Sequence, residues 1–109
     1  MGSLQALRKY PISSQNMTVK WSKTALANLA SITQYIERDN VTRAKTFVQE
    51  IRQKTNVLAE FPGMGRPGRV LGTRELVVHE NYIVPYRVRG GDVEILRVHH
   101  VARQWRKRL

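Results

Sequence analysis

The segment from Phe61 to Arg69 contains three glycines and two prolines, and it divides the chain into two parts with different hydrophobic periods. Proline lacks a backbone N–H and clashes with the preceding helical turn, and glycine weakens a helix, so no helix passes through this segment. Before it, apolar residues recur every three or four positions, as in amphipathic helices. After it, β-branched and aromatic residues predominate. The sequence therefore predicts an α+β fold.

Two helices are predicted before this loop. Ser22 is suited to cap a first helix that ends near Arg38, and Asn40 is suited to cap a second. The predicted apolar faces are Leu26, Leu29, Ile32 or Thr33, and Ile36 on the first helix, and Ala44, Phe47, Val48, Ile51, Thr55 and Leu58 on the second. The short connection predicts an antiparallel helix pair, in which Phe47, Ile51 and Leu58 face the sheet.

Strands are predicted at residues 18–21, before the helices, and at residues 74–79, 82–89 and 93–99 after the loop. Gly90-Gly91-Asp92 indicates a hairpin between the last two strands. Pro85 cannot donate to a ladder, so we expect it at a sheet edge or a bulge. The element order is β-α-α-β-β-β, a helical hairpin packed on a largely antiparallel sheet. We assign this domain to residues 17–109 and interpret residues 1–16 as a tag, an upstream extension or a mobile arm.

The charge of the chain is its most unusual compositional property. Its 109 residues include 19 Lys+Arg and 8 Asp+Glu, which gives a net charge of +11. Such an excess indicates an anionic partner: nucleic acid, an acidic protein or a membrane surface. There is no cysteine, which excludes disulfides and thiolate chemistry and fits a reducing cytosol. No apolar run is long enough to span a membrane and no secretory signal is present, so we expect a cytoplasmic protein without a membrane partner.

His99 and His100 close the last predicted strand. Neighbours on a strand point to opposite faces, so only His99 shares a face with Arg97. An imidazole beside an arginine is suited to general acid catalysis near a phosphate. The alternative is a structural histidine at the margin of the sheet. Adjacent histidines on opposite faces cannot chelate one ion and no acidic cluster accompanies them, so we expect no metal and no cofactor.

The stretch from Gly65 to Trp105, GRPGRVLGTRELVVHENYIVPYRVRGGDVEILRVHHVARQW, resembles the RelE/ParE superfamily of bacterial type II toxins. The likeness extends back to Met17 and includes the opening strand, the helical hairpin and the Phe-Pro and Gly-Arg loop. The resemblance implies a microbial-RNase-like fold, a cytosolic toxin, and a cognate acidic antitoxin that neutralises it.

The superfamily divides by target. The Gly-Arg-Pro-Gly-Arg, Thr-Arg-Glu-Leu-Val-Val and Ala-Arg-Gln-Trp segments are similar to the ParE branch, which poisons DNA gyrase. The lysines typical of the RelE branch are missing, because no Lys lies between Thr55 and Arg106. We therefore expect a gyrase-binding toxin, with Arg103 and Trp105 as contact residues.

The alternative is a RelE-like, metal-independent endonuclease that cuts mRNA on the ribosome. In that case the resemblance places Arg97 and His99 in the catalytic site, with His100 as a less suitable substitute for His99. The arginines expected to hold phosphates are Arg66, Arg69, Arg74 and Arg87, and the candidate bases are Glu60, Glu75 and Glu80. A third possibility is a basic nucleic-acid-binding domain unconnected with toxicity.

Overall fold

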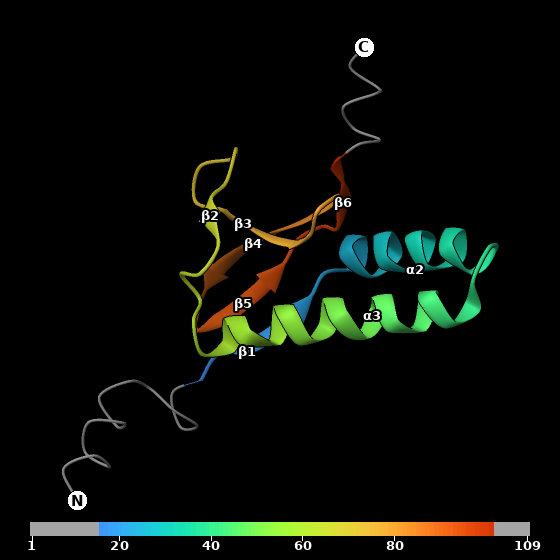
Figure 1. Cartoon of the computed structure of the whole chain (residues 1–109). Coiled ribbons are helices and arrows are strands. Elements are labelled where there is room, and N and C mark those ends of the chain that lie inside the picture. Colours follow the sequence, from blue (N-terminus) through green and yellow to red (C-terminus); the bar gives the residue numbers. More distant parts are fainter. Residues whose placement is uncertain (1–15, 102–109) are drawn as a thin grey trace, which may run out of the picture.

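Two helices pack on one side of a six-stranded sheet in the computed structural model, which describes residues 16–101 (Figure 1). The elements are, in chain order, β1 (Thr18–Trp21), α2 (Lys23–Glu37), α3 (Val41–Asn56), the 3₁₀ turn η2 (Val57–Ala59), β2 (Arg66–Pro67), β3 (Arg74–His79), β4 (Tyr82–Arg89), β5 (Asp92–Ile95) and β6 (His99–His100). This arrangement confirms the predicted fold class. No helix within the described residues is long and apolar enough to cross a membrane.

Both helices begin at the predicted caps. The Ser22 hydroxyl accepts a hydrogen bond from the Ala25 N–H at 3.0 Å, and the Asn40 side chain accepts one from the Arg43 N–H at 2.9 Å. On α3 the predicted face is confirmed, because Ala44, Phe47, Ile51 and Thr55 are buried on it and Leu58 is buried in η2, while Val48 is half-buried.

The predicted face of the first helix was wrong at Leu26, which is 49% exposed. The buried residues of α2 are Ala25, Leu29 and Ile32. The rotation of α2 about its axis is fixed at its first residues, because the N–H of the cap Ser22 donates to the Ile95 carbonyl of β5 at 3.0 Å. The small Ala25 therefore faces the sheet at this close approach, and Leu26 turns outward.

The strand order is β1-β5-β4-β3-β2, so β4 lies at the centre, antiparallel to β3 and β5. The pairing of β1 with β5 is parallel. Gly90 and Gly91 form the predicted turn between β4 and β5 with φ of 58° and 83°. A two-residue hairpin turn of this kind needs positive φ at both central positions, and it matches the twist of the flanking strands.

The prediction of one strand over residues 93–99 was wrong, because β5 ends at Ile95 and β6 begins at His99. After the Leu96 N–H, which still bonds to β4, the backbone bonds to side chains at the start of α2 instead of to a strand. The Ser22 hydroxyl donates to the Leu96 carbonyl at 3.0 Å, and the Val98 N–H donates to the Asn28 side chain at 3.1 Å. These side-chain partners replace the ladder and turn the chain, so β6 pairs with β4 alone.

The expectation for Pro85 also needs correction, since this residue lies in the central strand. Its carbonyl accepts from the N–H of Leu96 at 2.9 Å, and Leu96 is the first residue after the end of β5. The backbone of Pro85 therefore points toward the end of β5 on this side. The N and C=O of one strand residue point to the same side of the strand, so the nitrogen of Pro85 also points toward the end of β5. The hydrogen bond that proline cannot donate would therefore lie where the β4–β5 ladder already stops. Proline is tolerated here for that reason.

The register of α3 predicts the stability of two variants. Ile51 is 1% exposed, so Ile51→Ala should destabilise the domain by about 2–5 kcal/mol, because it removes buried methyl groups and leaves a cavity. Leu26→Ala, at an exposed site, should change stability by about 0.5 kcal/mol or less. Urea denaturation followed by circular dichroism measures both, and equal losses would contradict the two helix registers.

Candidate functional site

The two faces of the sheet differ because the side chains of β4 alternate. Tyr82, Val84 and Tyr86 are buried on the helix side, where the Tyr82 ring lies 4.9 Å from the ring of Phe47. Ile83, Pro85 and Arg87 therefore point to the opposite face. That face holds a depression of about 350 Å³, which we call the basic hollow. Its polar lining residues are Arg69, Thr73, Glu75, Arg87, Arg97 and His99.

Glu75 is the one carboxylate that lines the basic hollow, and it is 7% exposed. One of its oxygens lies 3.4 Å from the guanidinium of Arg66, and the other accepts from the Arg69 N–H at 3.3 Å. Both oxygens therefore already have partners. The antiparallel pairing of β2 with β3 explains the contact with Arg66, because Arg66 lies directly opposite Glu75.

The arginines around the hollow are only partly neutralised. The Arg87 side chain lies 2.6 Å from Glu94, and this hydrogen bond lowers the pKa of the Glu94 carboxyl. Among the described residues, Arg69 and Arg97 form no ion pair with a carboxylate. The hollow is therefore electropositive.

His99 and His100 lie on opposite faces, as the alternation predicts. His99 lines the hollow with Arg97, and His100 packs against Tyr82 with ring centroids 4.7 Å apart. Burial lowers the pKa of His99, and the positive charges of Arg97 and Arg69 lower it further. Its imidazole is therefore mainly neutral near pH 7. The catalytic role considered for these histidines remains a prediction.

The other predicted site residues are distributed unevenly. Arg69 and Arg87 line the hollow, and Arg66 reaches it through Glu75. Arg74 turns away and donates to the Gly65 carbonyl at 2.7 Å, so it ties β3 to the loop that precedes β2. Arg103 and Trp105 lie outside the described residues. Within the described part of the chain, no group of three His, Cys, Asp or Glu side chains could hold a metal ion.

Tyr86 anchors the loop that carries Arg66 and Arg69. Its ring is fully buried, and its hydroxyl accepts from the Gly65 N–H at 2.9 Å and donates to the Pro62 carbonyl at 2.7 Å. A Cβ at Gly65 would lie 2.7 Å from the Tyr86 ring and 2.9 Å from the Glu75 carbonyl, so only glycine fits there. Sequence reasoning missed the anchoring role of Tyr86, because its hydrogen bond to Gly65 spans 21 positions and has no local sequence signal.

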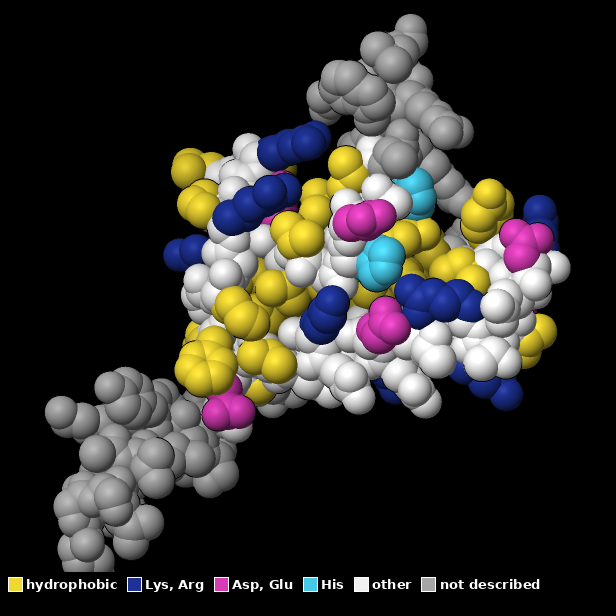
Figure 2. Space-filling view, in the orientation of Figure 1, with side chains coloured by type: hydrophobic (Ala, Val, Ile, Leu, Met, Phe, Trp, Pro, Cys, Tyr) yellow, Lys and Arg dark blue, Asp and Glu magenta, His cyan; other side chains and the backbone are white. Residues whose placement is uncertain are grey.

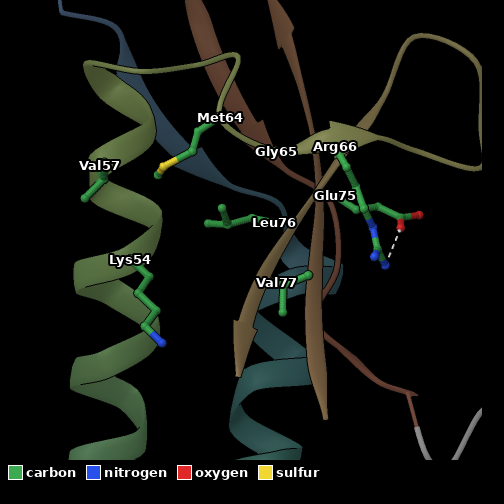
Figure 3. Close-up of a pocket in the computed structure, with 8 residues that line it drawn as sticks. All are labelled: Lys54, Val57, Met64, Gly65, Arg66, Glu75, Leu76 and Val77. Carbon is green, nitrogen blue, oxygen red and sulfur yellow. Dashed lines mark hydrogen bonds and ion pairs between the residues drawn. The ribbon is translucent and has the colours of Figure 1, made fainter. Parts of the chain in front are cut away.

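A second depression of about 460 Å³ lies between the end of α3 and the outer side of β3, and we call it the apolar groove. Figure 3 shows Met64 and Leu76 directed into the space between helix and strands, with Lys54 and Val57 on the helical side. Val57, Met64 and Val77 are 39%, 49% and 53% exposed. Hydrophobic side chains gather on this part of the surface in Figure 2. Sequence reasoning did not single out these residues.

Comparison with known proteins shows that residues 19–105 match a family model described as the ParE toxin of the type II toxin–antitoxin system parDE. The Y4kP protein of Sinorhizobium fredii is 46% identical over 88 residues, which are 80% of this chain and 91% of that protein. Toxin RelE2 of Caulobacter vibrioides is 36% identical over 85 residues, which are 78% of this chain and 96% of that protein.

Among solved structures, a chain of the chromosomal ParDE TA system from P. aeruginosa superposes with a TM-score of 0.74 at 31% identity. The alignment covers 80% of this chain and 98% of that one. The likeness therefore extends over most of the fold.

The electropositive hollow predicts a specific titration. The pKa of His99 should lie below the ordinary value of about 6.5, and Arg97→Gln should raise it, whereas Arg52→Gln on the exposed side of α3 should not. The unfolded chain binds this proton more readily, so the contribution of His99 to stability is complete above about pH 6.5 and decreases as the pH falls through the folded pKa. The pH dependence of the His99 ring signals in NMR spectra measures the shift, and an unchanged pKa in Arg97→Gln would contradict the assignment.

Proposed function

The chain belongs to the ParE toxin family of type II toxin–antitoxin systems, and we propose that it stops growth by binding DNA gyrase rather than by cutting RNA. The observation that supports this proposal is the state of Glu75, the one carboxylate in the basic hollow. It is buried, and both of its oxygens are occupied by donors from Arg66 and Arg69. The proposal places the protein in the cytoplasm with its target.

RNA cleavage through the ribose 2′-hydroxyl needs one group to remove a proton and a second to return one to the leaving oxygen. A mainly neutral His99 can accept a proton. The hollow then offers no group that could donate a proton to the leaving oxygen. Arginine does not give up its proton, and both oxygens of Glu75 already accept hydrogen bonds. Glu60 and Glu80, the other candidate bases, are not among the residues that line the hollow. The hollow is therefore better equipped to bind an anion than to transfer protons.

The second candidate function is the RelE-like mRNA endonuclease. Two observations favour it: Arg69, Arg97 and His99 line the same hollow, and the 36% identical relative from Caulobacter vibrioides is named Toxin RelE2. In this function the arginines would stabilise the pentacoordinate phosphate. Rapid translation arrest with cut mRNA after induction would support it, whereas a DNA-damage response with filamentation would support gyrase binding.

We also propose that the antitoxin of this toxin docks in the apolar groove. Three half-exposed to exposed apolar side chains, Val57, Met64 and Val77, surround a depression large enough for side chains of a partner. Lys54 also lines the groove and offers a positive charge to an acidic partner, whereas Arg66 is paired there with Glu75. Burial of the apolar side chains supplies affinity that salt does not screen, and the cation supplies a part that it does.

Growth assays separate the two functions at the level of residues. Under gyrase binding, His99→Ala should remain toxic because no proton has to move, and Trp105→Ala should lose toxicity because aromatic residues are common binding hot spots. Under the nuclease function, His99→Ala should lose about 10²–10⁴ in rate and permit growth.

Each variant is expressed without antitoxin, and circular dichroism of the purified protein confirms that it is folded. Arg103→Ala should behave like Trp105→Ala if the C-terminal segment contacts gyrase. A harmless His99→Ala variant beside a toxic Trp105→Ala variant would contradict gyrase binding.

The docking proposal predicts different effects at two valines near opposite ends of α3. Val57→Glu, in the apolar groove, should weaken antitoxin binding by about tenfold or more, which corresponds to about 1.4 kcal/mol. Val41→Glu should have little effect, although Val41 is 55% exposed and begins the same helix. Calorimetric titration of the toxin with the antitoxin measures both affinities.

The same titration at rising salt tests the balance of forces. Affinity should decrease with salt but persist, because the apolar part of the interface is not screened. Complete dissociation at moderate salt, or equal losses in Val57→Glu and Val41→Glu, would refute docking in this groove.

A further inference from the structure

The basic hollow has no assigned ligand if the toxin performs no chemistry. We propose that it holds one phosphodiester group of duplex DNA without cutting it. This inference rests on the proposed function, because gyrase acts on duplex DNA. It names the part of the toxin that would contact that DNA.

The cations of the hollow come from three separate parts of the chain. Arg69 lies in the loop between β2 and β3, Arg87 lies in β4, and Arg97 lies between β5 and β6. Arginine donates parallel hydrogen bonds from a planar group that matches two phosphate oxygens. A single bound anion would stabilise three arginines that come together from distant segments. A surface that only keeps the protein soluble does not need its arginines to meet at one point.

The charge balance leaves capacity for an anion. Glu75 is shared between Arg66 and the Arg69 backbone, and Arg87 is held by Glu94. The guanidinium groups of Arg69 and Arg97 have no carboxylate partner among the described residues. Burial lowers the pKa of His99, and this excess of positive charge lowers it further. A phosphodiester would place one negative charge between these two unpaired cations.

The walls of the hollow suit a nucleotide better than a carboxylate side chain. Ile83, Pro85 and Leu96 contribute apolar surface between the cations. A phosphodiester is flanked by sugar carbons, which such surface can contact. The volume of about 350 Å³ exceeds the roughly 30 Å³ of one water molecule about tenfold, which leaves room for a phosphate and an adjoining sugar.

Fluorescence anisotropy tests the site with a labelled 20-base-pair DNA duplex and the full chain. Arg97→Gln should weaken binding about tenfold and lower the slope of log affinity against log salt by about one. Arg69→Gln should act in the same direction. Arg52→Gln is the matched control, because it removes the same charge from an exposed position on α3 and should change affinity less than twofold.

Two other polymers identify the ligand class. A single-stranded RNA of equal length and polyglutamate should both bind more weakly than the duplex. Equal losses in Arg97→Gln and Arg52→Gln would mean diffuse charge attraction and overturn the site. Tighter binding of polyglutamate or RNA, or cleavage of the RNA, would also overturn it.

Capture of the toxin on immobilised, DNA-free gyrase separates this inference from the proposed function. Arg97→Gln should be captured as well as the parent protein, because the hollow contacts DNA and not gyrase. Loss of capture with unchanged DNA affinity would overturn the inference and leave gyrase binding intact. Normal DNA binding without any capture would instead refute gyrase as the target.

Discussion

The hydroxyl of Tyr86 holds the two candidate surfaces, the basic hollow and the apolar groove, in place. Tyr86 lies in the central strand, and through its hydrogen bonds to Gly65 and Pro62 it fixes the glycine- and proline-rich loop against the sheet. Because this hydroxyl is buried, loss of either partner would leave a polar group unsatisfied at a cost of about 1–3 kcal/mol. Within this loop, Met64 lines the apolar groove and Arg69 lines the basic hollow. One buried hydrogen-bonding group therefore orders both surfaces.

The two surfaces differ in the physical forces that they offer to a partner. The apolar groove lies beside α3 and the outer side of β3 and presents exposed hydrophobic side chains (Figures 2 and 3). The basic hollow lies on the face of the sheet away from the helices, meets the groove at Glu75, and presents arginines in excess of carboxylates. A toxin that is neutralised by an antitoxin and also acts on a target has a use for two such sites. Residues that line only one of the two surfaces, such as Val57 in the groove and Arg97 in the hollow, allow each surface to be altered by itself.

The sequence was sufficient to predict the parts of the fold that depend on local period and turn chemistry. The face of α3, the two helix caps and the Gly90-Gly91 turn follow from neighbours within one or two turns of chain. The break after Ile95, the position of Pro85 and the rotation of α2 could not be predicted, because each depends on a bond to a distant segment, such as Val98 to Asn28. The site divides in the same way. Alternation along a strand placed His99 apart from His100, but the burial of Glu75 and the outward turn of Arg74 depend on strand register.

The central claim is that this toxin acts by binding gyrase and not by cutting RNA. Incubation of the purified toxin with gyrase, ATP and supercoiled plasmid, followed by denaturant and protease, tests it most directly. The account predicts that linear plasmid accumulates with toxin concentration, because gyrase is trapped after it has broken the DNA, and that His99→Ala gives the same yield. Absence of linear plasmid, together with cut mRNA when the same protein is added to a translation extract, would contradict the account.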